Sequence, residues 1–127
     1  MNGLAAVTVL ALLEYLVLGA MVGRARTRYK VEAPATTGNP EFERYFRVHQ
    51  NTLESLIVFI PALWLFGRYV SNPLAVALGL IFIAGRIIYA VGYVKAPEKR
   101  EAGALITFGV NLILILGTLL ALARLKL

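Results

Sequence analysis

The sequence has 127 residues, of which 59% are hydrophobic and only 16% are charged, and its mean hydropathy is +0.73. Soluble domains are about 45–50% apolar and about 25% charged, so this composition excludes a soluble core of this size, and it equally excludes a disordered chain. The net charge of +6 favours anionic lipid or an anionic ligand over nucleic acid, and the absence of cysteine excludes a disulfide and any thiol nucleophile of the protein's own.

The first two predicted helices cover residues 4–22 and 40–69. Each contains the run of about 20 apolar residues that a helix needs to cross the hydrocarbon core. A signal peptide is disfavoured for the first run, because no basic segment precedes it and Glu14 interrupts it. The second helix has a strong start, with Asn39 as N-cap and Pro40 at the first helical position, and Pro61 predicts a kink within it.

The remaining predicted helices cover residues 73–94 and 101–122. The turn at residues 71–73 is short, and Ala96-Pro97 separates the last two helices. The sequence therefore predicts an all-α membrane protein, a single four-span domain over residues 1–127, with both termini on one side of the bilayer. The positive-inside rule places the loops 24–39 and 95–100 in the cytoplasm, because most of the basic residues lie in or beside them. The compact ends favour a bacterial inner membrane.

Polar side chains share one face on each of two neighbouring predicted helices, because they recur at spacings of three and four residues. The short turn makes these helices antiparallel neighbours, so depth can be counted from it at 1.5 Å per residue. Glu54 then lies about 21 Å and Arg86 about 20 Å from the turn, and the other two pairs are also in register. The three pairs, from the middle of the bilayer toward the cytoplasm, are Glu54 with Arg86, Asn51 with Tyr89, and Arg47 with Tyr93.

The deepest pair admits two readings, a structural ion pair or part of a ligand site. An ion pair between Glu54 and Arg86 would not explain Arg47 or the Asn and Tyr side chains, which leave hydrogen-bond donors free. Donors exceed acceptors on these faces, so the sequence predicts a cytoplasmic cleft for a carboxylate-bearing ligand.

Other polar residues carry weaker signals. Glu14 and Asn111 fall near the middles of the first and last helices, where we expect each to satisfy a partner within the bundle. His49 has no acidic or Cys companion at metal-ligand spacing, so no metal site is expected. A Ser-His-Asp triad cannot form because the chain has no Asp, and no glycine-rich phosphate loop is present.

Two blocks resemble the MAPEG family, the membrane-associated proteins of eicosanoid and glutathione metabolism. The blocks are TTGNPEFERYFRVHQNTLE at residues 36–54 and RIIYAVGY at residues 86–93, the second followed by Arg100. The resemblance implies a homotrimer of left-handed four-helix bundles, with a glutathione site between subunits that opens to the cytoplasm. It also implies a membrane-bound glutathione transferase or peroxidase of detoxification, with glutathione as co-substrate and a lipophilic electrophile or lipid hydroperoxide as acceptor.

The resemblance carries over site residues one by one. Arg100 matches the arginine that stabilises the glutathione thiolate, and Arg26 matches one supplied by the neighbouring subunit. Positions matching the family's glutathione contacts are Arg47, His49, Asn51, Glu54, Arg86, Tyr89 and Tyr93.

The chain departs from the leukotriene-forming member at three positions. Thr27 replaces an arginine implicated in epoxide opening, Ser55 replaces a tyrosine, and His49 replaces a glutamine. These departures argue against leukotriene synthesis and leave glutathione binding intact. Two alternatives remain: a non-catalytic lipid-binding scaffold of the same family, and a small four-helix multidrug transporter, for which Glu14 is suggestively placed.

Overall fold

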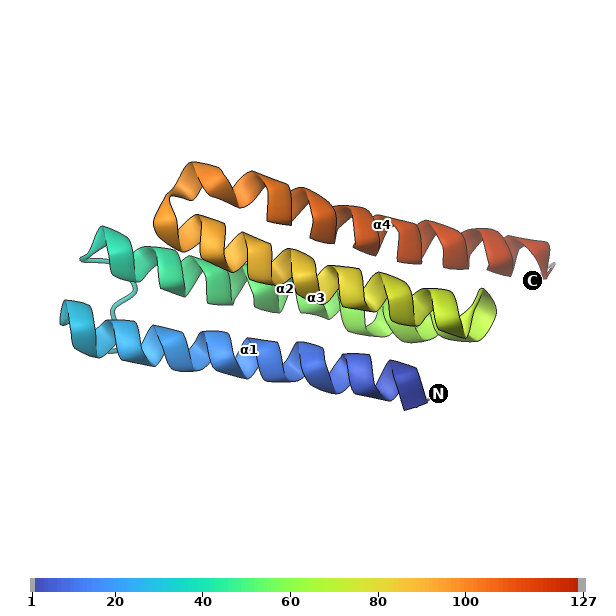
Figure 1. The fold of residues 1–127 in the computed structure, drawn as a ribbon, viewed down its shortest axis with the longest axis horizontal. Coiled ribbons are helices and arrows are strands. Elements are labelled where there is room, and N and C mark those ends of the chain that lie inside the picture. The colour runs from blue at the N-terminus through green and yellow to red at the C-terminus, as the bar shows by residue number, and fades with distance from the viewer. Residues whose placement is uncertain (1, 126–127) are drawn as a thin grey trace.

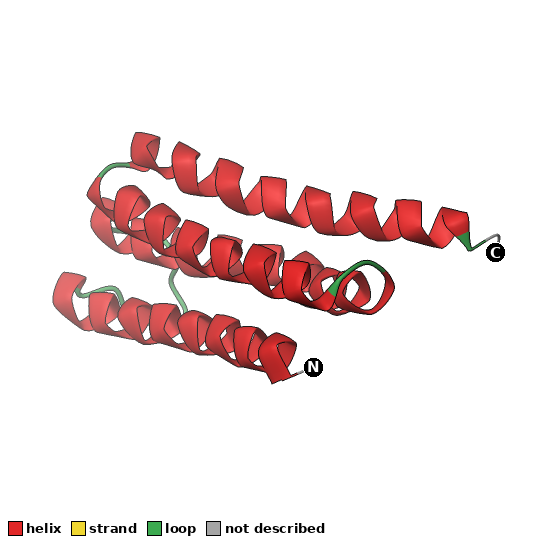
Figure 2. Ribbon diagram, turned by 45° about the vertical axis from the view of Figure 1, so that its right-hand side comes forward, coloured by secondary structure: helices red, strands yellow, loops and turns green. Residues whose placement is uncertain are grey.

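The computed structural model describes residues 2–125, and the chain forms four long helices within that range (Figure 1). The long connections α1–α2 and α3–α4 lie at one end of the bundle, and the α2–α3 turn and both termini lie at the other (Figure 2). All four helices are long and apolar enough to cross a membrane. Their bounds are α1 Asn2–Tyr29, α2 Pro40–Tyr69, α3 Asn72–Lys95 and α4 Glu101–Arg124, with a short 3₁₀ helix, η1, at Pro97–Arg100.

Helix α2 begins and ends where the sequence predicts. The Asn39 side chain accepts a hydrogen bond from the Phe42 backbone N–H at 2.9 Å, and Pro40 opens the first turn. This cap satisfies one of the N–H groups that a helix start leaves without a partner. The helix is continuous through Pro61.

The predicted end of the first helix at residue 22 is wrong, since α1 continues to Tyr29. Gly23 does not stop it, because the residues that follow include Arg24, Arg26 and Arg28, and Arg is a good helix former favoured near a helix C-terminus. The helix ends where Lys30 takes a positive φ of 56°. The basic residues are therefore ordered on the last two turns of α1 rather than in a loop.

Helices α2 and α3 form the centre of the bundle. Helix α1 packs against both of them, and α4 packs against both from the other side (Figure 1). The middle of the core is closed by the rings of Phe59 and Phe82, which stack with centroids 3.8 Å apart. Gly103 lets α4 approach the backbone of α3 at Tyr89, because a side chain there would collide with that backbone.

Candidate functional site

Asn51 on α2 and Tyr89 on α3 are joined by a hydrogen bond. The Asn51 Nδ2 donates to the Tyr89 hydroxyl oxygen at 2.6 Å. Tyr89 is buried and its ring meets that of Tyr93 edge-on, with centroids 5.6 Å apart. The predicted register of the two polar faces is confirmed at this level, because antiparallel neighbours with a short turn between them must keep equal depths aligned.

Arg47 and Tyr93 lie at the same level, nearer the loop end of the bundle, as the register predicts. They line a common cavity of about 240 Å³. Arg100, on η1, holds its guanidinium carbon 5.3 Å from the centre of the Tyr93 ring, and its side chain is otherwise exposed. The site candidates Asn51, Tyr89, Tyr93 and Arg100 therefore form one continuous row, with Arg47 beside it.

Arg44 is a residue of this region that the sequence analysis did not single out. Its Nη1 donates to the backbone carbonyls of Val94 and Lys95, at 3.2 Å each. These are among the last carbonyls of α3, which lack partners within the helix. Arg44 therefore fastens the end of α3 to α2 and fixes the position from which η1 and Arg100 begin.

The predicted ion pair between Glu54 and Arg86 is wrong for the subunit. Arg86 is buried, and its Nε and Nη2 both donate to the hydroxyl of Thr52, at 3.2 and 3.0 Å. Its Nη1 donates to the hydroxyl of Thr107 at 3.1 Å, and its guanidinium carbon lies 4.0 Å from the centre of the Tyr89 ring. Glu54 is exposed on α2. Side chains two residues apart on a helix point in directions roughly 200° apart, so Thr52 and Glu54 cannot both face α3.

Thr52 and Thr107 are functional neighbours that the sequence analysis missed. Both are buried, and together they accept three hydrogen bonds from Arg86. The sequence does contain a signal for them, because a buried guanidinium requires acceptors on the helices around it and both residues carry hydroxyl groups inside apolar spans.

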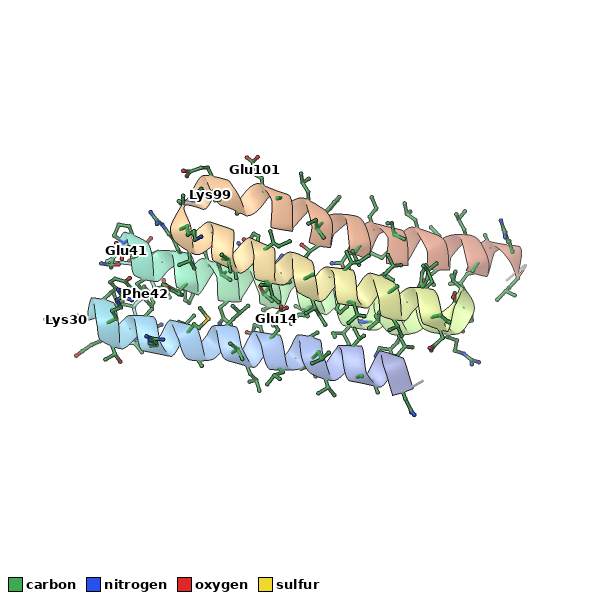
Figure 3. The ribbon with its side chains drawn as sticks, in the orientation of Figure 1. Glu14, Lys30, Glu41, Phe42, Lys99 and Glu101 are labelled. Atoms are coloured by element: carbon green, nitrogen blue, oxygen red, sulfur yellow. The ribbon has the colours of Figure 1, made fainter. Side chains whose placement is uncertain are left out.

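Asn111 and Glu14 behave differently from each other. Asn111 donates to the backbone oxygen and the hydroxyl of Ser55, at 3.4 and 3.3 Å, so its expected partner within the bundle is confirmed. Glu14 points from α1 toward α3 (Figure 3). Its carboxylate interacts electrostatically with Arg86, but neither oxygen has a hydrogen-bond partner among the described residues, so that expectation is not met.

Two further site candidates, Arg26 and His49, lie away from the row in the subunit. The His49 ring stacks on Tyr15 of α1, with centroids 4.2 Å apart. The Arg26 Nη1 donates to the carbonyls of Ala35 at 2.8 Å and Val31 at 3.4 Å, which holds the loop after α1.

The arrangement as a whole suits an anionic ligand. Arg44, Arg47 and Arg100 converge at the loop end, next to an amide and two phenols that can donate hydrogen bonds. Within residues 2–125, no group of three or more His, Cys, Asp or Glu side chains could hold a metal ion.

Four membrane-length helices with a polar cluster at one end define a multi-pass integral membrane protein. The family model for MAPEG matches residues 4–120. The chain belongs to the MAPEG family, as its two sequence blocks indicated.

Three similar proteins show which members of the family the chain resembles. An uncharacterised protein of the cyanobacterium Synechocystis is 50% identical over 117 residues, 92% of this chain and 85% of the relative. Human microsomal glutathione S-transferase 2 is 44% identical over 117 residues, 91% of this chain and 80% of the relative. Guinea pig (Cavia porcellus) leukotriene C4 synthase is 37% identical over 99 residues, 78% of this chain and 66% of the relative. The cyanobacterial relative supports a bacterial origin.

Proposed function

We propose that this protein is a membrane-bound glutathione transferase that activates the glutathione thiol and conjugates it to lipophilic electrophiles, or uses it to reduce lipid hydroperoxides. The observation that carries the proposal is the row Asn51–Tyr89–Tyr93–Arg100, with Arg47 beside it, at the loop end of the bundle. The names of the human and guinea pig relatives support the same chemistry.

Glutathione fits the donors present. It carries two carboxylates, which suit arginines such as Arg47, and peptide groups, which suit Asn51. Its thiol has a pKa near that of Cys, about 8.5, so most of it is protonated at neutral pH. The Arg100 guanidinium favours the thiolate, which is the competent nucleophile.

The two reactions differ in the acceptor. In conjugation, the thiol proton leaves to water, and the thiolate sulfur forms a bond to an electrophilic carbon, from which a leaving group departs or on which a ring opens. In peroxide reduction, two glutathione molecules become one disulfide, while the hydroperoxide becomes an alcohol and water. Both acceptors reach the site from the bilayer, because they partition there.

A homotrimer would explain why some predicted glutathione-site residues lie away from the row within one subunit. Glu54 is exposed on α2. Among the described residues the Arg26 side chain donates hydrogen bonds only through its Nη1, so its Nε and Nη2 can serve a ligand. We infer that a neighbouring subunit brings its Arg26 and His49 to the ligand held by the Arg47 and Asn51 face. The crosslinked or native mass of the detergent-solubilised protein tests this.

Arg47→Ala is expected to weaken glutathione binding about tenfold or more, because it removes a charge-assisted hydrogen bond to a carboxylate. Arg47 is exposed, so the thermal unfolding temperature is expected to stay unchanged. Calorimetric titration of the purified protein measures the binding, and Arg68→Ala, an exposed arginine at the opposite end, is the control. Unchanged affinity in Arg47→Ala would remove this residue from the proposed site.

The non-catalytic alternative is tested on the same protein. A lipid-binding scaffold would give no conjugation of an aromatic electrophile and no reduction of a lipid hydroperoxide, even with glutathione bound. Turnover with either acceptor would show that the protein is an enzyme and not a scaffold. The ratio of the conjugation rate to the peroxide-reduction rate measures which reaction dominates.

The orientation in the membrane gives a separate prediction. The positive-inside rule favours a cytoplasmic position for the end of the bundle that carries the long connections, because most of the basic residues lie near it. A cysteine introduced at Lys30 is therefore expected to resist an impermeant thiol reagent in intact cells and to react after the cells are opened. Because the chain has no other cysteine, labelling from outside would directly reverse the orientation.

A further inference from the structure

An apolar groove of about 590 Å³ runs between α1 and α3. Its walls are aliphatic side chains such as Leu10 and Val17 on α1 and Ile87 and Val91 on α3, all of which are exposed in the subunit. It shares no lining residue with the cavity that holds Arg47 and Tyr93. The groove is therefore distinct from that cavity, and Arg86 is the one site candidate among its lining residues.

One stripe of α1 lines this groove and continues past it. The stripe repeats at spacings of four and three residues, which places its members on one face of the helix. Apart from Glu14 it is apolar in the span, and it becomes basic in the last two turns. Its members are Leu10, Glu14, Val17, Met21, Arg24 and Arg28.

A smaller cavity of about 110 Å³ adjoins the groove at its loop end. Met21 lines both cavities, and the smaller one is otherwise formed by Arg24, Arg28, Tyr29 and Tyr45 together with Ala25. Lys95 closes the same end of the groove from α3. The apolar groove and the pocket of cations and phenols therefore meet at Met21.

The three cations at this end are free to bind a ligand. Arg24, Arg28 and Lys95 are exposed, and none of them has an ion-pair partner in the part of the chain that the structure describes. The Arg28 guanidinium carbon lies 5.4 Å from the centre of the Tyr29 ring, so the ring attracts the cation without neutralising its charge. Guanidinium groups match the geometry of phosphate oxygens.

The length of the groove matches one leaflet of a bilayer. Leu10 and Met21 are eleven residues apart, which is about 16 Å along a helix. The hydrocarbon core is about 30 Å thick, so an acyl chain from one leaflet covers about half of it. A chain lying in the groove would place its headgroup beside Arg24, Arg28 and Lys95.

We infer that this groove binds an anionic phospholipid of the leaflet on the loop side, with an acyl chain between α1 and α3 and the phosphate against Arg24, Arg28 and Lys95. The Glu14 carboxylate oxygens are inaccessible beneath the groove, so recognition comes from the apolar walls and the basic end. The basic end selects an anionic headgroup by charge complementarity. The apolar groove requires that the headgroup carry an acyl chain.

The test compares phosphatidylglycerol with phosphatidylcholine of identical acyl chains, added to delipidated, detergent-solubilised full-length protein. Native mass spectrometry measures the bound lipid, and thermal unfolding provides a second readout. The double variant R24Q/R28Q is expected to lose about 30-fold of the preference for phosphatidylglycerol. R68Q/R124Q is the matched control, because it removes two exposed arginines from the opposite end, one of them also beside a tyrosine ring.

Two further arms separate the parts of the site. Inorganic phosphate and glycerol phosphate are expected to give no stabilisation, because they cannot fill the groove. The Val17→Trp variant is expected to bind both lipids more weakly, because the tryptophan side chain fills the groove. An unchanged lipid preference in R24Q/R28Q would overturn the inference. So would stabilisation by inorganic phosphate alone, or a Val17→Trp variant that changes oligomeric mass while lipid binding persists, since the groove would then hold a second copy of the chain.

Discussion

Arg100→Ala is expected to lower the rate of glutathione conjugation by about 10²–10³, the range seen when one donor that stabilises a reacting anion is removed. Arg100 stands over the ring of Tyr93 at the loop end of the bundle and contributes no buried side chain to the core. Its loss should therefore change chemistry and leave helix content and assembly intact. Stopped-flow turnover with an aromatic electrophile and the absorbance of the enzyme-bound thiolate measure the effect.

The pH dependence distinguishes thiolate stabilisation from simple loss of binding. Without the Arg100 charge, the thiol pKa rises toward its value in solution, so the defect should be largest at low pH and shrink as the pH increases. Lys99→Ala is the control, since Lys99 is exposed on the same short helix. A full thiolate signal with normal turnover in Arg100→Ala would transfer the role to Tyr93.

Thr52→Val is expected to destabilise the protein by about 2 kcal/mol, because it leaves two N–H groups of a buried guanidinium without their acceptor. The Nε and Nη2 of Arg86 both donate to the Thr52 hydroxyl, and Arg86 is 4% exposed, so water cannot replace it at the surface. Valine keeps the shape of threonine, so the change isolates the hydroxyl. Thermal unfolding in detergent is the measurement.

Two controls accompany this variant. Thr118→Val removes another buried hydroxyl, whose only hydrogen bond within residues 2–125 goes to the Leu114 carbonyl of its own helix at 2.7 Å. This change is expected to cost much less. Glu54→Ala is expected to keep the wild-type unfolding temperature, because Glu54 is exposed and does not hold Arg86. If Glu54→Ala were destabilised and Thr52→Val were not, Glu54 rather than Thr52 would be the residue that holds Arg86.

The sequence alone determined much of the architecture. Hydropathy and length defined four spans, and the Asn39–Pro40 pair fixed the start of α2, because caps are local chemistry. The short turn before α3 fixed antiparallel depth, so the Asn51–Tyr89 contact followed from counting residues. The MAPEG blocks are likewise contiguous motifs that need no tertiary information.

Only the tertiary structure decided how far each helix is rotated about its axis. Depth along a helix is set by residue number, but the direction of a side chain changes by about 100° per residue. Thr52 and Glu54 lie at nearly the same depth and point to nearly opposite sides of α2, and only the packing shows that Thr52 is the one that meets Arg86. The packing of the other helices placed Thr107 of α4 against the same guanidinium, and left Glu14 beneath the groove between α1 and α3. Burying Arg86 requires acceptors from two other helices at once, and their convergence is a property of packing rather than of any one segment.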